Sequence, residues 1–143
     1  MQRRGSARWQ GTTQEGNGTL SVQSGTLRDT PYSFKARFAE GQGTNPEELI
    51  AAAHAGCFTM ALSFALNNAG FTAGAIETEA QVTMEPVDGK PTIKAIHLMV
   101  RAQVPQIAAA QFLEIASNAK VNCVVSRALS PSITVTMDAS LAS

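Results

Sequence analysis

Two cysteines, Cys57 and Cys123, are the only thiols in this 143-residue chain, and they are the side chains best suited to chemistry. A thiolate is a nucleophile, and two thiols that meet in space can serve as an attacking and a resolving thiol. His54, three residues before Cys57, would share its face on a helix and could assist it. From composition alone, the simpler interpretation is favoured: Cys57 is a small buried hydrophobe and His54 a satisfied core histidine.

The segment GTNPEELIAAAHAGCF, which contains Cys57, predicts the start of a long helix. Asn45 is the expected N-cap, Pro46 suits the first helical position because its missing N–H costs nothing there, and Glu48 completes a capping-box pattern. Gly70 is the expected stop signal. The sequence therefore predicts a helix from Pro46 to about Asn68.

This expected helix is apolar on nearly every side, which predicts burial on every side. Its length would suffice to cross a membrane. We instead interpret it as the central helix of a globular core, because it is only mildly hydrophobic and is interrupted by the polar residues His54, Ser63 and Asn67.

The two thiols are expected to be activated differently. Cys57 lies in the middle of its helix, where the helix dipole cannot lower its pKa, so it needs a nearby cation; His54 and Arg37 are both candidates. Cys123 is expected in the first turn of a short helix capped by Asn122, where the dipole stabilises a thiolate. The simpler alternative for Cys123 is a buried turn residue.

The rest of the chain predicts strands on either side of this helix and further helices after them. A clear hairpin is indicated by the turn Asp88-Gly89 between two alternating segments. The expected elements are strands at Ser6–Gln10, Thr19–Val22 and Tyr32–Phe38, the long helix, strands at Ala75–Glu85 and Thr92–Val104, helices at Ala108–Lys120 and Asn122–Leu129, and a last strand containing Ile133, Val135 and Met137. This order predicts one α+β domain over residues 1–143, with antiparallel sheets packed on helices.

Composition narrows the classes of partner. Eleven basic and eleven acidic residues give no net charge, which argues against nucleic acid. Low charge and alanine-rich helices predict that a second copy of the chain covers part of the surface. The first ten residues, MQRRGSARWQ, contain no apolar signal segment, so a cytoplasmic protein with no membrane partner is expected. We find no recognised metal-ligand spacing and no cofactor motif, although His54, Cys57, His97 and Cys123 could meet in space.

With these residues in view, the chain resembles the osmotically inducible protein C (OsmC) and organic hydroperoxide resistance (Ohr) superfamily, and its OsmC branch most of all. The resemblance rests on GTNPEELIAAAHAGCF, its continuation TMALSFAL, the downstream NCVVS and the upstream SGTLRDTPYSFKARF. It implies an intertwined homodimer that reduces organic hydroperoxides to alcohols and is regenerated by an external dithiol. The apolar residues Phe58 and Met60 near Cys57 predict a preference for apolar peroxides.

The resemblance also implies roles for four residues. Cys57 matches the cysteine that attacks the peroxide, Cys123 the resolving cysteine, Arg37 the arginine that holds the thiolate, and Glu47 the acid that orients this arginine. The chain departs from the family at Val124, where the family usually has proline after the resolving cysteine. The absence of this proline could loosen the turn that orients Cys123.

The spacing of Glu47 and Cys57 has a geometric consequence. Ten residues of straight helix rise roughly 15 Å, so Glu47 either is only a cap residue or serves the site of a second chain.

Two alternatives remain open from the sequence. The first is a non-catalytic dimer of the same fold that binds an apolar small molecule. The second is an acyl-transfer enzyme built on Cys57 and His54, which lacks an obvious orienting partner for the histidine and an identifiable oxyanion hole.

Overall fold

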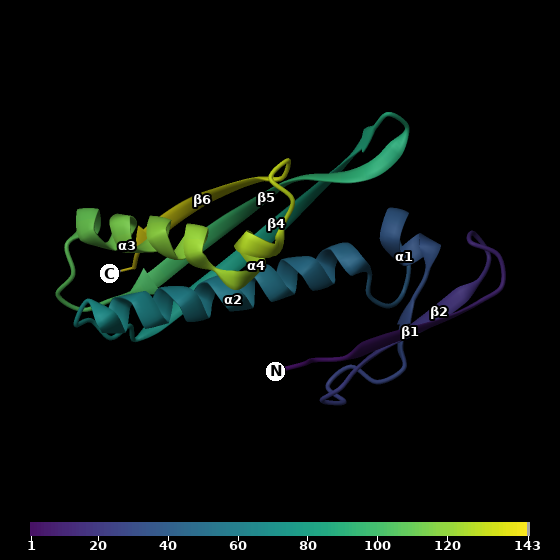
Figure 1. Ribbon diagram of the computed structural model, residues 1–143, viewed down its shortest axis with the longest axis horizontal. Helices are drawn as coiled ribbons and strands as arrows, with labels where there is room; N and C mark the ends of the chain where they lie inside the picture. Colours follow the sequence, from purple (N-terminus) through teal and green to yellow (C-terminus); the bar gives the residue numbers. More distant parts are fainter. Residues whose placement is uncertain (143) are drawn as a thin grey trace. The chain divides into compact units, whose positions relative to one another are not determined.

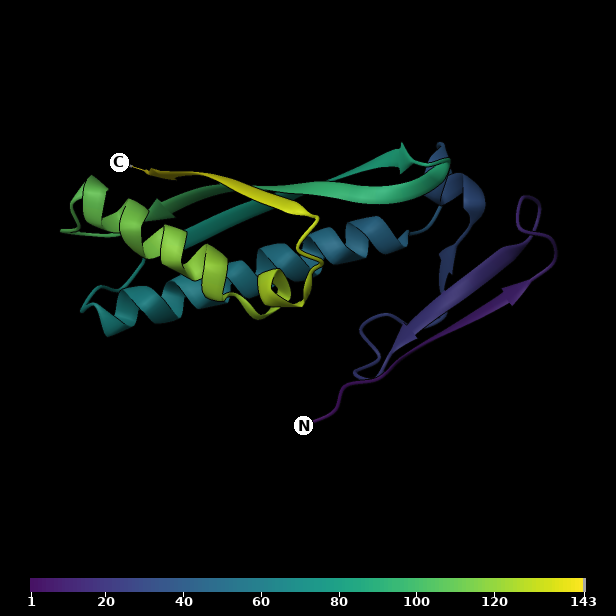
Figure 2. The ribbon, with the colours of Figure 1, turned by 45° about the horizontal axis from the view of Figure 1, so that its top comes forward.

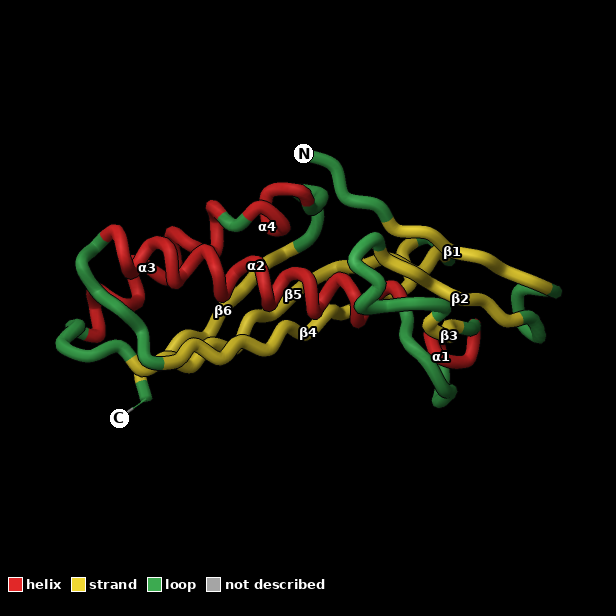
Figure 3. Tube along the Cα trace, turned by 90° about the horizontal axis from the view of Figure 1, so that it is seen from below, coloured by secondary structure: helices red, strands yellow, loops and turns green. Residues whose placement is uncertain are grey.

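The computed structural model describes residues 1–142, and the chain forms two compact units that divide after Leu49. The first unit begins with a three-stranded antiparallel sheet of β1 (Gly5–Gln10), β2 (Asn17–Val22) and β3 (Thr30–Tyr32), in that order (Figure 3). The expected first two strands are therefore confirmed to within two residues.

The expected strand Tyr32–Phe38 is wrong beyond its first residue, because β3 ends at Tyr32 and a short helix, α1 (Phe34–Phe38), follows. Ser33 is the reason: its hydroxyl accepts a 3.1 Å hydrogen bond from the backbone N–H of Ala36, which caps the helix. The alternating apolar residues pack within one turn instead, with the rings of Phe34 and Phe38 4.8 Å apart.

The long helix α2 (Pro46–Asn68) has the predicted bounds. The side-chain oxygen of Asn45 accepts a 2.8 Å hydrogen bond from the backbone N–H of Glu48, which confirms the N-cap. In a complete capping box the Glu48 carboxylate would accept a hydrogen bond from the backbone N–H of Asn45. Here it accepts a 2.6 Å hydrogen bond from the Thr44 hydroxyl instead. Gly70, with a φ of 88°, follows the end of the helix as predicted.

The second unit is built on a sheet of β4 (Ala75–Val87), β5 (Lys90–Gln103) and β6 (Thr134–Leu141), in that order. Strands β4 and β5 form the predicted hairpin, and its turn residues Asp88 and Gly89 have φ angles of 51° and 76°. Strand β6 pairs parallel to β5, so the expectation of purely antiparallel sheets is wrong for this strand. Alternation predicts a strand but not its direction, which the helical connection between β5 and β6 sets here.

Helices α2, α3 (Ala109–Asn122) and α4 (Val124–Ala128) lie over the same face of this sheet, as Figures 1 and 2 show. The core between these layers is apolar. Its fully or almost fully buried side chains include Phe58, Leu62 and Leu66 from α2, Ile96 and Leu98 from β5, and Phe112 and Ala116 from α3.

Helix α2 buries only one stripe of side chains within its own chain, namely His54, Phe58, Leu62 and Leu66. The expectation that this helix is buried on every side is therefore wrong for a single chain: Met60 is 73% exposed and Phe64 69% exposed. By length and composition α2 is apolar enough to cross a membrane, with a mean hydropathy of 1.8. Because the stripe packs on the sheet, we retain its interpretation as a core helix that presents an uncovered apolar face.

Candidate active site

The two cysteines, far apart in the sequence, come together where α3 gives way to α4. Cys123 ends α3 and caps α4, so the short helix begins one residue later than expected and Asn122 is not its N-cap. Cys123 is 1% exposed, while Cys57, in the middle of α2, is partly buried. Both are free thiols, and a hydrogen bond joins their side chains.

The environment of Cys57 favours its thiolate. Burial raises the pKa of the thiol, but hydrogen bonds from the side chain of Cys123 and from the backbone N–H groups of Val125 and Val124 outweigh burial. The pKa of Cys57 therefore lies below its ordinary value of 9.0.

The environment of Cys123 favours its protonated form. Burial raises the pKa of this thiol most, and its hydrogen bond with Cys57 raises it further. The backbone N–H and hydroxyl of Ser126 and the N–H of Val125 act in the opposite direction without cancelling these effects. The pKa of Cys123 therefore lies above 9.0, so Cys57 is the first of the pair to lose its proton, and its thiolate can accept a hydrogen bond from the Cys123 thiol.

These contacts reverse one sequence expectation and add to another. The sequence suggested that the start of the short helix would lower the pKa of Cys123, but this pKa is raised. The backbone N–H groups of Val124 and Val125, at the start of this helix, lower the pKa of Cys57 instead. The sequence also suggested that Cys57 needs a cation, yet hydrogen bonds lower its pKa within this unit. Sequence reasoning missed Val124 and Val125 as thiolate donors, because a backbone N–H has no sequence signal and acts here across the tertiary fold.

His54 is completely buried and bonds to a residue that the sequence analysis did not single out. Its Nε2 atom lies 2.8 Å from the Oγ atom of Ser126. Burial lowers the pKa of His54, which keeps the imidazole neutral. This arrangement weakens the acyl-transfer hypothesis, because the His54 Nε2 atom is engaged with Ser126 rather than with Cys57.

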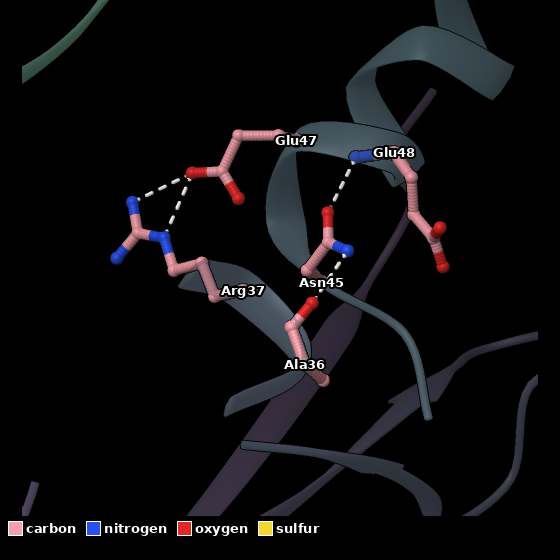
Figure 4. A network of polar contacts seen from close by, with 5 residues as sticks. All are labelled: Ala36, Arg37, Asn45, Glu47 and Glu48. Atoms are coloured by element: carbon pink, nitrogen blue, oxygen red, sulfur yellow. Dashed lines mark hydrogen bonds and ion pairs between the residues drawn. The ribbon is translucent and has the colours of Figure 1, made fainter. Parts of the chain in front are cut away.

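The other two predicted residues, Arg37 and Glu47, pair in the first unit. Figure 4 shows the two side chains pointing toward each other from α1 and the first turn of α2. The Arg37 Nε and Nη2 atoms donate to the same carboxylate oxygen, Glu47 Oε1, at 2.8 and 2.7 Å. A hydrogen bond of 3.0 Å from the Asn45 amide to the Ala36 carbonyl ties α1 to the start of α2 and supports this geometry.

The Arg37 guanidinium also borders an aromatic cavity of about 320 Å³ in the same unit. Its lining includes the rings of Trp9, Tyr32, Phe34 and Phe38. The guanidinium carbon lies 5.0 Å from the centre of the Phe38 ring, a cation–π distance. The cavity therefore combines an apolar wall with one fixed cation.

Burial decides which of Phe58 and Met60 can line a substrate site. Phe58 is completely buried in the core, so it cannot line a substrate site, whereas Met60 is exposed. Within residues 1–142, no group of three or more His, Cys, Asp or Glu side chains is arranged to hold a metal ion.

Comparisons with known proteins agree with this architecture. A family model described as OsmC-like protein matches residues 39–138. Peroxiredoxin OsmC of Escherichia coli K12 is 46% identical over 135 residues, which cover 94% of each chain. The crystal structure of the organic hydroperoxide resistance protein OhrB of Bacillus subtilis aligns with a TM-score of 0.78 at 26% identity, covering 98% of both chains. An OsmC-like protein from Mycoplasma pneumoniae has the same fold, with a TM-score of 0.77 at 12% identity. This chain belongs to the OsmC/Ohr family and has its α+β fold.

Proposed function

We propose that this protein is a cysteine-based, thiol-dependent peroxidase that reduces organic hydroperoxides to alcohols. The observation that supports it most is the hydrogen-bonded thiol pair, in which the pKa of Cys57 is lowered and that of Cys123 is raised. The first thiol is prepared to attack and the second keeps its proton until it is needed. The 46% identity to a peroxiredoxin supports the same activity.

The reaction proceeds in three steps. The Cys57 thiolate attacks the O–O bond, the alcohol leaves after taking up a proton, and Cys57 becomes a sulfenic acid. Cys123 then attacks the Cys57 sulfur, which forms a disulfide and releases water. An external dithiol reopens this disulfide by exchange and restores both thiols.

Arg37 and Glu47 are proposed to bind the peroxide. Glu47 fixes the guanidinium through two donors to one oxygen, which aims the cation at the peroxide oxygens and at the thiolate. The aromatic cavity beside Arg37 supports an apolar organic group on the substrate.

We further propose that the site is completed in an intertwined homodimer. Along α2, ten residues separate Glu47 from Cys57, a rise of roughly 15 Å. The Arg37–Glu47 pair of one chain would then serve Cys57 of the second chain. The exposed Met60 and Phe64 give α2 an apolar face that such a dimer would cover.

In this proposal the two units of the chain act together as a single OsmC-like domain over residues 1–143. The cycle begins and ends with free thiols, which suits the reducing cytoplasm. We therefore place the protein there.

A thiol count tests the peroxidase proposal. The reduced protein receives one equivalent of cumene hydroperoxide per chain, and the free thiols are titrated beside Cys57→Ser and Cys123→Ser variants. We expect the wild type to lose both thiols and to regain them with a dithiol, Cys123→Ser to stop at a sulfenic acid, and Cys57→Ser to keep its thiol. Loss of neither thiol in the wild type would contradict the peroxidase proposal.

A non-catalytic binding dimer is the second candidate function, and the aromatic cavity is the observation in its favour. In that case the thiols would survive the peroxide, and an apolar ligand without an O–O bond would bind with unchanged affinity in the Cys57→Ser variant.

A further inference from the structure

His54 has a role that neither the thiol pair nor the Arg37–Glu47 pair explains. It lies one turn before Cys57 on α2 and is completely buried. Its hydrogen-bond partner Ser126 lies three residues after Cys123, on α4. This hydrogen bond therefore joins the helix that carries Cys57 to the helix that Cys123 caps.

The direction of this hydrogen bond follows from the other ring nitrogen. The Nδ1 atom of His54 is buried and has no hydrogen-bond partner within residues 1–142. A proton on Nδ1 would leave a buried N–H without an acceptor, and orphaned buried N–H groups are rarer in proteins than unpaired acceptors. The neutral imidazole therefore carries its proton on Nε2 and donates it to the Ser126 oxygen.

This assignment leaves the hydroxyl proton of Ser126 free for Cys123. We propose that His54 and Ser126 form a hydrogen-bond relay, from Nε2–H to Oγ and from Oγ–H to the Cys123 sulfur, that positions Cys123 for its attack on oxidised Cys57. Both residues are positioning residues, since neither touches the peroxide. The inference rests on the two-cysteine cycle proposed above.

The relay acts in the step that forms the disulfide. The Cys123 sulfur bonds to the Cys57 sulfur, the S–O bond of the sulfenic acid breaks, and the departing hydroxide is protonated to water. To attack as a thiolate, Cys123 must first release its own proton. As this proton leaves, negative charge grows on the Cys123 sulfur, and the Ser126 hydroxyl bond strengthens. No external oxidant takes part, and His54 neither gains nor loses a proton.

The surroundings of Cys123 make such a donor necessary. Burial raises the pKa of Cys123, and the Ser126 hydroxyl is the one side-chain donor that lowers it. The charged and titratable groups on the surrounding elements are otherwise engaged. Lys120 on α3 donates to the Val135 carbonyl, and His97 bonds to Asp138 on the face of β5 opposite the buried Ile96 and Leu98. Arg127 on α4 is exposed.

Rapid mixing of the full-length protein with cumene hydroperoxide tests the relay, with oxidation of Cys57 and formation of the disulfide timed separately. We expect Ser126→Ala and His54→Leu to slow disulfide formation about tenfold, the effect of losing one hydrogen bond to a developing charge. Oxidation of Cys57 should slow much less. Ser126→Thr, which keeps a hydroxyl, and His54→Gln, which keeps an N–H donor, should restore most of the rate.

Ser132→Ala is the matched control, because it removes an exposed hydroxyl that bonds only to Ser130, in the loop after α4. A second readout is independent of catalysis: in a Cys57→Ser background, ultraviolet absorbance of the thiolate reports the pKa of Cys123, which Ser126→Ala should raise. Wild-type disulfide formation in Ser126→Ala and His54→Leu, or an unchanged Cys123 pKa, would overturn the relay. A wild type that forms no disulfide overturns the two-cysteine cycle instead, and the Cys123 titration then decides the relay alone.

Discussion

The backbone N–H of Val124 donates a hydrogen bond to the sulfur of Cys57, across the interface between α4 and α2. The OsmC/Ohr pattern usually places proline at this position, and proline has no N–H. Cys123 has φ −54° and ψ 130°, an extended conformation that a following proline also favours. Val124 therefore follows a turn conformation that is compatible with proline, and it supplies an N–H to the thiolate that proline could not supply.

We predict that Val124→Pro raises the pKa of Cys57 and slows its oxidation. The lost bond to a charged sulfur is worth about 1.5 kcal/mol, so the rate constant with cumene hydroperoxide at neutral pH should fall about tenfold. Folding should persist, since Val124 is 71% exposed and occupies the first position of α4, where proline is tolerated.

The matched control is Val124→Ala, which trims the side chain but keeps the N–H. It should react like the wild type. Equal rates for the proline and alanine variants would show that this amide contributes nothing to the thiolate.

A mixed dimer tests whether Arg37 acts on the second chain. Arg37→Ala and Cys57→Ser should each be inactive as pure proteins. If Arg37 serves the partner's site, a dimer with one chain of each kind contains one intact site, so coexpression should restore about a quarter of wild-type activity through random pairing. Activity that stays at background in purified mixed dimers would show that Arg37 and Cys57 act within one chain.

The Glu47 carboxylate is predicted to matter through the orientation of Arg37. Glu47→Gln keeps the size of the side chain but removes the charge that holds two guanidinium donors. We expect a rise in KM for apolar hydroperoxides and a smaller fall in kcat, measured by steady-state kinetics with a dithiol reductant. Unchanged kinetics in Glu47→Gln would show that Glu47 does not act in catalysis and only stabilises the start of α2.

Leu62 and Phe64, two residues apart on α2, should respond to substitution in opposite ways. Leu62 is completely buried, so Leu62→Ala should lower the free energy of unfolding by about 2–5 kcal/mol, measured by urea denaturation. Phe64 is 69% exposed in the single chain. We expect Phe64→Asp to leave the fold intact and to give monomers in light scattering, with loss of peroxidase activity.

Leu113→Asp is the control for Phe64→Asp, because Leu113 is exposed on α3 rather than on α2. It should remain dimeric. A Phe64→Asp protein with the wild-type mass and full activity would place the subunit contact elsewhere.

Local signals in the sequence were sufficient for much of the fold. The bounds of α2 follow from Asn45, Pro46 and Gly70, and the hairpin from Asp88 and Gly89, because caps and turns depend on residues near in sequence. The helix Phe34–Phe38 was missed because an alternating pattern this short also fits one helical turn, and the Ser33 cap decides between them.

The candidate site was predictable only in part. Cys57 and Cys123 could be named as a pair because they are the only thiols, and the structure joins them by a hydrogen bond. Their charge states could not be predicted, since those depend on backbone N–H groups from α4 and on burial, which arise only in the folded chain. Ser126 is missed for the same reason: its partner His54 is 72 residues away.

The opposite pKa shifts of the two thiols predict different pH dependences for the two chemical steps. The pKa of Cys57 lies below 9.0, so oxidation should reach its maximum at a lower pH than for an ordinary thiol and should slow as the pH falls through this lowered pKa. The pKa of Cys123 lies above 9.0, so disulfide formation should keep accelerating, by up to about tenfold per pH unit, over the alkaline range. Sulfenic acid should therefore accumulate near neutral pH and be short-lived in alkali, which trapping with a sulfenic-acid-specific reagent after rapid mixing would measure. If the rates of both steps increased with pH around one shared midpoint, the pKa values of Cys57 and Cys123 would not be shifted in opposite directions.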